Sequence, residues 1–255
     1  MKYILKKGGK RNMKIVFHPK FYTVYTTDPA AESGRMEAIV EELQDFEFVE
    51  PEPARKEDIL LVHTPEHYAY VKSDEKVYEV AALAVGGAIM ASRIAFDEPS
   101  FAAVRPPGHH ASPDSSWGFC YFNNIAIAVK KLLEEGRIGR AVIVDFDLHF
   151  GDGTSNTFAG DDRVKYFHMQ GGDLAGIDDF LAGEEYDIIA VSAGFDRHKA
   201  DWGGILETED YREIGKIVKE NAEEKCGGRR FAVLEGGYNH SVLGKNVKAF
   251  VEGME

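Results

Sequence analysis

Four short apolar runs, each followed at once by charged or polar side chains, constrain the fold of this chain more than any other feature. Residues 142–144, 188–191 and 231–234 are compact and rich in β-branched or aromatic side chains, and residues 101–104 form a weaker fourth run. Such runs predict strands that are buried on both faces of a parallel sheet. Residues 13–17 predict a further short strand near the start of the chain.

Amphipathic segments separate these runs. Apolar side chains recur at helical spacing over residues 80–95, 124–135 and 208–225, which predicts three helices. Thr208, followed by two acidic residues, is typical of a helix N-cap. Alternating strands and helices predict an α/β fold, a three-layer α/β/α sandwich with a mostly parallel sheet.

The domain organisation is expected to be simple. The sequence has no internal repeat, no low-complexity tract and no long linker, so residues 1–255 are expected to form a single domain. A basic cluster precedes Met13. Residues 1–12 are therefore a candidate for a disordered or extra N-terminal extension, with a short first strand as the alternative.

Composition narrows the classes of function. The chain has 43 acidic and 30 basic residues, a formal net charge of -13, which is the reverse of a typical nucleic-acid-binding protein. Two cysteines, Cys120 and Cys226, cannot form a disulfide framework. We see no signal peptide and no apolar run near 18 residues, so we expect a cytoplasmic protein that inserts in no membrane and binds no nucleic acid directly. The acidic charge suits solubility and also a cationic substrate.

Titratable side chains follow the carboxyl ends of the predicted strands. In parallel α/β sheets the ligand site lies beyond the carboxyl ends of the strands. The segments that follow the four runs are residues 105–110, 145–152, 192–196 and 235–239, and all are rich in titratable side chains. Their convergence predicts an active site at this edge of the sheet.

The spacing of Asp145, Asp147 and His149 indicates a metal site. In an extended chain these three side chains would point to the same face. The preceding run is buried, and buried charges need a partner or a metal, which disfavours the alternative of an exposed edge strand. Only two of the three need bind directly, and Asp196, after another strand, is the best candidate for a further ligand. Such a ligand set with an open fourth position is typical of catalytic zinc.

Two adjacent histidines are candidates for proton transfer. His109 and His110 follow a rigid Pro-Pro-Gly turn, and Asp145 and Asp152 are available to orient their imidazoles. A neutral and a charged histidine beside a metal-bound water supply a base and an acid. Tyr238 follows two glycines, so it suits either an ordinary surface turn or, beside a metal, a donor to an oxyanion.

Five ordered motifs together resemble the zinc-dependent histone deacetylase family, including its prokaryotic deacetylase-like and acetylpolyamine amidohydrolase members. The similarity extends from Ala81 to Asn239, with a weaker match near His18 and residues 32–39. The motifs are Arg-Pro-Pro-Gly-His-His from Arg105, Gly-Phe-Cys-Tyr-Phe-Asn-Asn from Gly118, Asp-Phe-Asp-Leu-His-Phe-Gly-Asp-Gly from Asp145, Ser-Ala-Gly-Phe-Asp from Ser192 and Leu-Glu-Gly-Gly-Tyr-Asn from Leu234.

The resemblance implies the arginase/deacetylase fold and a specific set of site residues. Zinc ligation is implied for Asp147, His149 and Asp196. Two catalytic dyads are implied by the same match, together with a tyrosine that stabilises the oxyanion; these residues are His109 with Asp145, His110 with Asp152, and Tyr238.

The resemblance also places the substrate. The Gly118 carbonyl would accept the substrate amide N–H, and Phe119 would line one wall of an acyl-lysine tunnel. Residues 171–183 replace a longer stretch that supplies the opposite wall in the family, so that wall is in question here. An aspartate that grips peptide backbone at the tunnel rim is not identifiable.

The resemblance further implies a structural potassium ion. It would be held by oxygens of Asp145, Asp147 and His149, with a serine that we do not find near residues 167–170. We therefore expect this site to be altered or absent.

We expect a metal-dependent amidohydrolase that removes acetyl from a small-molecule or peptide acetylated amine. Zn²⁺ is the expected ion, although Fe²⁺ or Mn²⁺ suit the same ligands. A catalytically silent acyl-amine binding protein on the same fold is one alternative. An arginase-like ureohydrolase is another, which Gly151, two residues beyond His149, disfavours because two bridged metals need more carboxylates.

Overall fold

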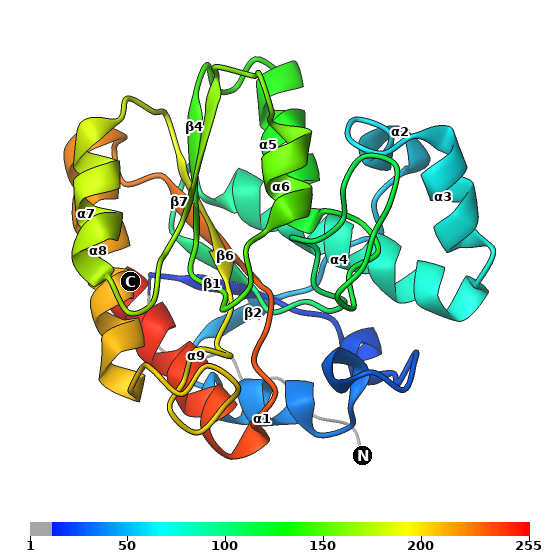
Figure 1. Ribbon diagram of the computed structural model, residues 1–255, viewed down its shortest axis with the longest axis horizontal. Helices are drawn as coiled ribbons and strands as arrows, with labels where there is room; N and C mark the ends of the chain where they lie inside the picture. The colour runs from blue at the N-terminus through cyan, green and yellow to red at the C-terminus, as the bar shows by residue number, and fades with distance from the viewer. Residues whose placement is uncertain (1–11) are drawn as a thin grey trace.

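A computed structural model of the protein describes residues 12–255 (Figure 1). The predicted N-terminal extension over residues 1–12 thus lies outside the described residues, apart from Asn12. Seven parallel strands in the described part form one sheet, in the order β2-β1-β3-β7-β6-β4-β5. Their bounds are Lys14–Val16 (β1), Glu47–Val49 (β2), Ser100–Ala102 (β3), Ala141–Asp145 (β4), Val164–His168 (β5), Ile189–Ala193 (β6) and Arg230–Leu234 (β7).

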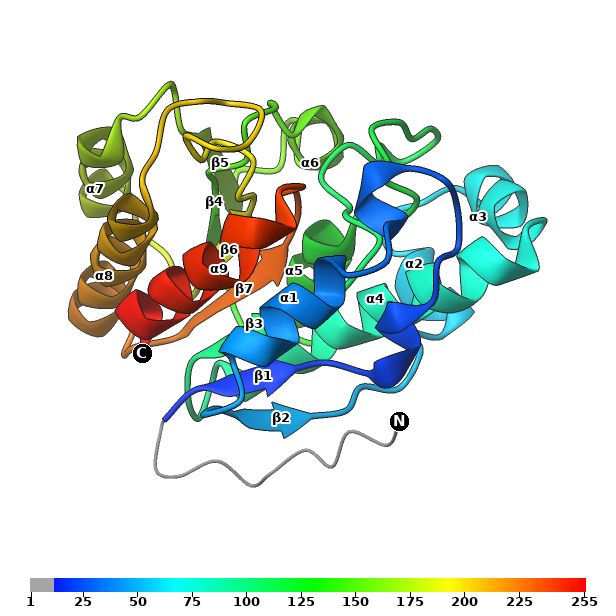
Figure 2. The same cartoon turned by 90° about the horizontal axis from the view of Figure 1, so that it is seen from below.

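Helices connect successive strands and cover both faces of the sheet (Figure 2). Helices α4 and α5 pack together on one face, and α1, α8 and α9 pack together on the other. The α-helices are Arg35–Glu42 (α1), Lys56–Ile59 (α2), Pro65–Lys72 (α3), Glu75–Ile94 (α4), Asn124–Glu134 (α5), Asp152–Thr157 (α6), Leu174–Gly183 (α7), Thr208–Lys225 (α8) and His240–Met254 (α9). Two 3₁₀ turns, η1 (Pro19–Tyr22) and η2 (Pro29–Ala31), precede α1.

The sequence predictions of the sheet are confirmed. The five predicted strands correspond to β1, β3, β4, β6 and β7, with ends that agree within two residues. The two edge strands, β2 and β5, had no clear apolar signal because they are partly exposed. All pairings are parallel, and the three-layer α/β sandwich is present as predicted.

Two helix starts differ from the predictions. Helix α4 begins at Glu75, capped by Asp74, rather than at residue 80. In α8 the N-cap is Glu207, whose N–H donates to the Asp210 carboxylate at 2.8 Å. Thr208 is the first helical residue instead, and its hydroxyl donates to Asn246.

Helix α4 is also longer than the predicted helix over residues 80–95, and it is more apolar than expected from a sequence in which we see no apolar run near 18 residues. Its 20 residues are long and apolar enough to cross a membrane by length and composition alone. However, 72% of its apolar window is buried, because the helix packs against β1, β3, β7 and α5. Burial inside the fold accounts for its apolar composition.

The strand order brings the predicted chemistry together. Strands β3, β7, β6 and β4 are successive neighbours in the sheet, and they are the four strands whose carboxyl ends precede the titratable segments. Hydrogen-bonded register places Asp145 beside Ser192, and Ala193 beside Leu234. The loops that follow therefore emerge side by side at one edge.

Candidate active site

Two aspartates and one histidine meet beyond β4 and β6. Nδ1 of His149 lies 3.3 Å from Oδ1 of Asp147 and 3.2 Å from Oδ2 of Asp196. One candidate ligand atom from each residue lies within 4.8 Å of the other two. The two carboxylates are buried, whereas His149 is half-buried and lines the pocket described below.

The surroundings of this triad fit a bound cation. Oδ2 of Asp196 is buried, and its one polar neighbour among residues 12–255, Nδ1 of His149 at 3.2 Å, does not meet hydrogen-bond geometry, although buried polar atoms are normally satisfied. Glycines leave room beside the carboxylates: a Cβ at Gly194 would lie 2.1 Å from Oδ2 of Asp147, and one at Gly236 would lie 2.5 Å from it. Asp147, His149 and Asp196 can hold a divalent metal through two oxygens and one nitrogen, with a further position open to the pocket.

The charge of the triad supports the same conclusion. Burial and the charge of Asp147 raise the pKa of Asp196. The interactions of its ring N–H with the carboxylates of Asp147 and Asp196 raise the pKa of His149 to about 10, because a proton there compensates two buried negative charges. A divalent cation would take the place of that proton, since metal ligands bind in their deprotonated forms.

The chain between Asp145 and His149 is folded differently from the prediction. Strand β4 ends at Asp145, so the expected extended segment does not continue to His149. The Asp147 N–H donates to Oδ1 of Asp145 at 3.0 Å, and the His149 N–H donates to Oδ1 of Asp147 at 2.9 Å. These bonds turn the backbone in the manner of Asx turns. Asp147 and His149 converge for this reason rather than through strand periodicity.

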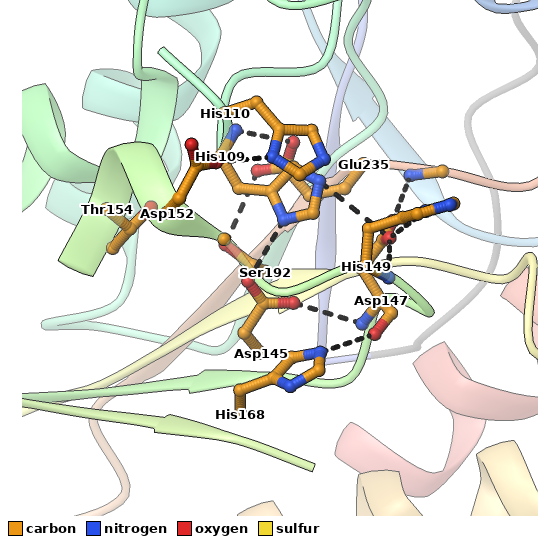
Figure 3. A network of polar contacts seen from close by, with 12 residues as sticks. His109, His110, Asp145, Asp147, His149, Asp152, Thr154, His168, Ser192 and Glu235 are labelled. Atoms are coloured by element: carbon orange, nitrogen blue, oxygen red, sulfur yellow. Dashed lines mark hydrogen bonds and ion pairs between the residues drawn. The ribbon is translucent and has the colours of Figure 1, made fainter. Parts of the chain in front are cut away.

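His109 is the first of two buried histidines against the triad (Figure 3). Its Nδ1 lies 3.0 Å from Oδ2 of Asp145, and its Nε2 lies 3.7 Å from Oδ1 of Asp147. The Tyr166 hydroxyl, from β5, donates to the same Asp145 oxygen at 2.9 Å. Asp145 is therefore committed to orienting His109, as the sequence predicts for this pair.

His110 has a separate partner set (Figure 3). Its Nδ1 lies 2.6 Å from Oδ1 of Asp152, at the start of α6. The other oxygen of Asp152 accepts a 2.8 Å hydrogen bond from the Trp117 indole. That indole also lies against the His110 ring, with centroids 4.0 Å apart. Trp117 thus holds both members of the pair, a role that the motifs did not indicate.

The two histidines differ in electrostatics although their sequence positions are adjacent. Burial favours neutral His109, but the charges of Asp147 and Asp145 outweigh it and raise its pKa well above the ordinary value. Burial and the charge of His109 lower the pKa of His110, and these effects exceed the opposing effect of Asp152. Their surroundings therefore shift the pKa values of the two histidines in opposite directions.

Glu235 fixes the turn that carries these histidines. It is fully buried, and Oε2 accepts the N–H groups of Gly108 and His109 at 2.7 and 3.1 Å. Burial raises its pKa to about 7. Sequence analysis identified Glu235 only as part of a motif, because its role depends on the pairing of β7 next to β3.

Tyr238 is held between aromatic and polar groups. Its ring stacks on Trp202, with centroids 4.1 Å apart and an interplanar angle of 26°. Phe119 packs edge-on at 5.9 Å, and Oδ2 of Asp201 accepts the Tyr238 N–H at 2.8 Å. Arg35 lies across the ring and donates to the Gly237 carbonyl at 2.8 Å. These contacts restrict the swing that two preceding glycines would otherwise permit.

The site opens into one small pocket of about 120 Å³. It is lined by Pro107, His109, His110, Trp117, Gly118, Phe119, His149, Trp202 and Tyr238. Gly118 has φ +59°, and a Cβ there would lie 2.5 Å from the His110 ring, so glycine is required at this position. Both residues predicted to contact substrate, Gly118 and Phe119, lie in the pocket wall.

The second tunnel wall, which the sequence left in question, is not supplied by residues 171–183, and Trp202 lines the pocket although the sequence analysis did not identify it. Residues 171–183 do not line the pocket, and most of them form α7. Trp202, in the loop after β6, instead contacts Phe119 at 6.5 Å between ring centroids. A tryptophan between the Asp196 motif and the next helix was the available signal.

The potassium site that the family resemblance implies does not fit the residues present. The Asp145 carbonyl accepts the Met169 N–H at 2.9 Å, and the Asp147 carbonyl accepts from the Arg197 guanidinium. His168, in the region expected to provide a serine, lies with Nε2 2.9 Å from the same Asp147 oxygen. Two of the three expected sources of oxygen ligands are therefore occupied, and we derive no role for potassium.

Fold and pocket together define an arginase/deacetylase-like α/β protein, and comparison with known proteins identifies its family. A family model described as the histone deacetylase domain matches residues 30–173 and 180–254. The crystal structure of the HDA15 HD domain has a TM-score of 0.84, with 21% sequence identity, over 94% of this chain and 88% of that chain. This similarity shows a shared fold.

Curated relatives agree with the family match. A probable deacetylase from Archaeoglobus fulgidus is 34% identical over 84% of this chain and 74% of its own length. A probable deacetylase from Methanothermobacter thermautotrophicus is 32% identical over 94% of this chain and 90% of its own length. This chain belongs to the histone deacetylase family. The break in the family match, between residues 173 and 180, coincides with α7.

The triad predicts the consequence of removing one ligand. Asp196→Ala should weaken zinc binding by more than about 100-fold, since loss of groups that merely support a ligand costs up to that factor. Equilibrium dialysis against buffered zinc, followed by metal analysis, measures the effect. Asp114→Ala, an exposed aspartate in the loop that precedes Trp117, is the control and should bind zinc normally. Equal zinc affinity in Asp196→Ala and the control would remove Asp196 from the site.

Proposed function

We propose that this protein is a zinc-dependent amidohydrolase that removes acetyl from an acetylated amine, of the acetyl-lysine or acetylpolyamine type. The products are acetate and the free amine. The observation that carries this proposal is the convergence of the metal-binding triad, two histidine–aspartate pairs and Tyr238 on one pocket. The names of the archaeal relatives, probable deacetylases, support the same activity.

Asp147, His149 and Asp196 would hold the zinc. Two carboxylates and an imidazole suit this ion, and Fe²⁺ or Mn²⁺ accept the same ligands. When bound, the metal polarises the amide carbonyl and lowers the pKa of a water molecule. The pocket lies next to His149, so a substrate carbonyl can approach the open position from the side of Tyr238 and the two histidines.

His110 is the base in this proposal. The short contact of Nδ1 with Asp152 leaves Nε2 free to accept a proton, and the lowered pKa of His110 keeps it neutral. His110 takes a proton from water as the water oxygen bonds to the carbonyl carbon. It returns that proton to the nitrogen as the C–N bond breaks. His109, oriented by Asp145, is a further donor toward the negative charge that develops nearby.

The pocket supports a preference for small acyl groups. Phe119 and Trp202 both line the pocket, and the volume of about 120 Å³ leaves little room beyond an acetyl group and a slender chain. The Gly118 carbonyl would accept the substrate amide N–H, and the Tyr238 hydroxyl would donate to the oxyanion. Acetylated primary amines meet these requirements.

Direct turnover measurements test the proposal. The zinc-loaded protein should release acetate and free amine in equal amounts from an acetyl-lysine peptide or N¹-acetylspermidine, with much slower release from butyryl analogues. A zinc chelator should abolish the reaction. Binding of all these amides without turnover would identify a silent binding protein, and urea release from arginine would identify a ureohydrolase.

Tyr238→Phe tests the oxyanion donor. The substitution keeps the ring that packs on Trp202 but removes the hydroxyl. Loss of one such donor should lower kcat by about 10²- to 10³-fold, with a much smaller change in KM because the bond strengthens as charge develops. Steady-state kinetics beside Tyr70→Phe, an exposed tyrosine of α3, provides the measurement. An intact kcat with a raised KM would leave Tyr238 only a role in substrate binding.

Trp117→Phe tests the support of the His110–Asp152 pair. Phenylalanine keeps an aromatic ring over His110 but removes the indole N–H. Losing a hydrogen bond worth about 1 kcal/mol should slow kcat by about fivefold, with zinc content unchanged. Trp117→Leu, which also removes the stacked ring, should slow the reaction further. Equal kcat values for the wild-type and Trp117→Phe proteins would show that the indole N–H does not contribute.

A further inference from the structure

Arg197 places a buried positive charge directly behind the metal-binding triad. The residue follows Asp196, and only 2% of it is exposed. Its guanidinium donates to four backbone carbonyls from two separate segments, those of Phe146, Asp147, Met169 and Gly171. We propose that Arg197 is a built-in cation that replaces a dissociable monovalent ion in holding the loops of Asp147 and Asp196.

Each of these carbonyls lies within hydrogen-bond distance of the guanidinium. Nε lies 2.9 Å from the Phe146 oxygen and 3.1 Å from that of Asp147. Nη2 lies 2.9 Å from the Asp147 oxygen and 2.5 Å from that of Met169, while Nη1 lies 2.6 Å from that of Gly171. Converging carbonyl dipoles repel one another, and a cation among them removes that repulsion.

The His168 ring is a further neighbour of the Asp147 carbonyl (Figure 3). Its Nε2 lies 2.9 Å from the Asp147 oxygen and 3.2 Å from Nη2 of Arg197, and Gln170 Nε2 lies 3.1 Å from its Nδ1. Two nitrogens of Arg197 and one of His168 therefore surround the Asp147 oxygen. The guanidinium takes the place beside this carbonyl that a monovalent cation would need.

Backbone carbonyls, rather than a directly paired carboxylate, surround the positive charge of Arg197, as they would surround a bound cation. Among the described residues, no carboxylate oxygen lies within 4.0 Å of its guanidinium. Burial lowers the pKa of Arg197, and the more distant charges of Asp147, Asp196 and Asp145 oppose that shift. Arginine nevertheless stays protonated in proteins. Carbonyl dipoles solvate the charge, and the buried acids supply its electrostatic complement.

The contacts also explain why this charge matters to the site. Arg197 binds the carbonyl of Asp147 and directly follows Asp196, so one side chain fixes the backbone of two proposed ligands. Its own carbonyl accepts the N–H groups of Ile205 and Leu206, which close the loop that carries Trp202. Arg197 is thus a positioning residue that links the metal-binding triad to the pocket wall.

The first test measures the wild-type protein in different salts. Melting temperature and Co²⁺ affinity, the latter followed by the visible absorption of the bound ion, are measured in KCl, NaCl and choline chloride at equal ionic strength. We expect both quantities to be the same in all three salts. Specific stabilisation or tighter Co²⁺ binding in KCl would overturn the proposal, because it would reveal a dissociable monovalent ion.

The second test removes the built-in charge. Arg197→Ala should lower Co²⁺ affinity by about 10- to 100-fold and the melting temperature by roughly 5–10 °C. Potassium or low concentrations of guanidinium, but not choline, should restore much of both losses. Arg197→Lys keeps one positive charge and should retain more Co²⁺ affinity than Arg197→Ala. Arg163→Ala, which removes an arginine paired with Asp161 on the surface, is the matched control.

These results separate a cation from an ordinary structural side chain. Equal losses in Arg197→Ala and Arg197→Lys, with no rescue by potassium or guanidinium, would mean that shape rather than charge is required. If Arg197→Ala does not fold, the comparison of Arg197→Lys with the wild type across the three salts decides the question. None of these measurements depends on turnover, so failure of the proposed deacetylation would leave their outcome unaffected.

Discussion

Burial of negative charge at the carboxyl ends of neighbouring strands is the constraint on which this site depends. Asp145, Asp147 and Asp196 are at most 1% exposed, and such charges are costly unless they are compensated. All three accept backbone N–H groups. Asp145 also interacts with His109 and Tyr166, whereas Asp147 and Asp196 share the imidazole of His149. The same acidity that destabilises an empty cluster makes it a strong cation ligand.

The division of labour between His109 and His110 follows from this distribution of charge. Their ring centroids are 4.1 Å apart, so a positive charge on one ring disfavours a positive charge on the other. Asp147 and Asp145 face His109, whereas Asp152 lies nearer the surface beside His110. The pKa of His109 is thereby raised and that of His110 lowered, without any difference in their intrinsic chemistry. Two identical residues in sequence therefore acquire different proton affinities from the strands that surround them.

Much of this arrangement was predictable because strand ends in a parallel sheet have a fixed place. The apolar runs before Asp145, Ser192 and Glu235 predicted buried strands, and the predicted site residues do meet beyond them. The supporting residues were not predictable in the same way. Tyr166 lies on an edge strand with a weak apolar signal. Arg197 binds backbone carbonyls, which every residue has, so no sequence pattern indicates its partners. Trp202 acquires its place only when its loop folds over Tyr238.

The location of the two tryptophans has a spectroscopic consequence. The chain contains only Trp117 and Trp202, and both line the pocket while remaining about half exposed. One contacts His110 and the other contacts Tyr238. Indole emission from the native protein therefore originates entirely at the pocket mouth. Quenching or a spectral shift reports ligand entry directly, with no contribution from tryptophan elsewhere in the molecule and no need for an attached dye.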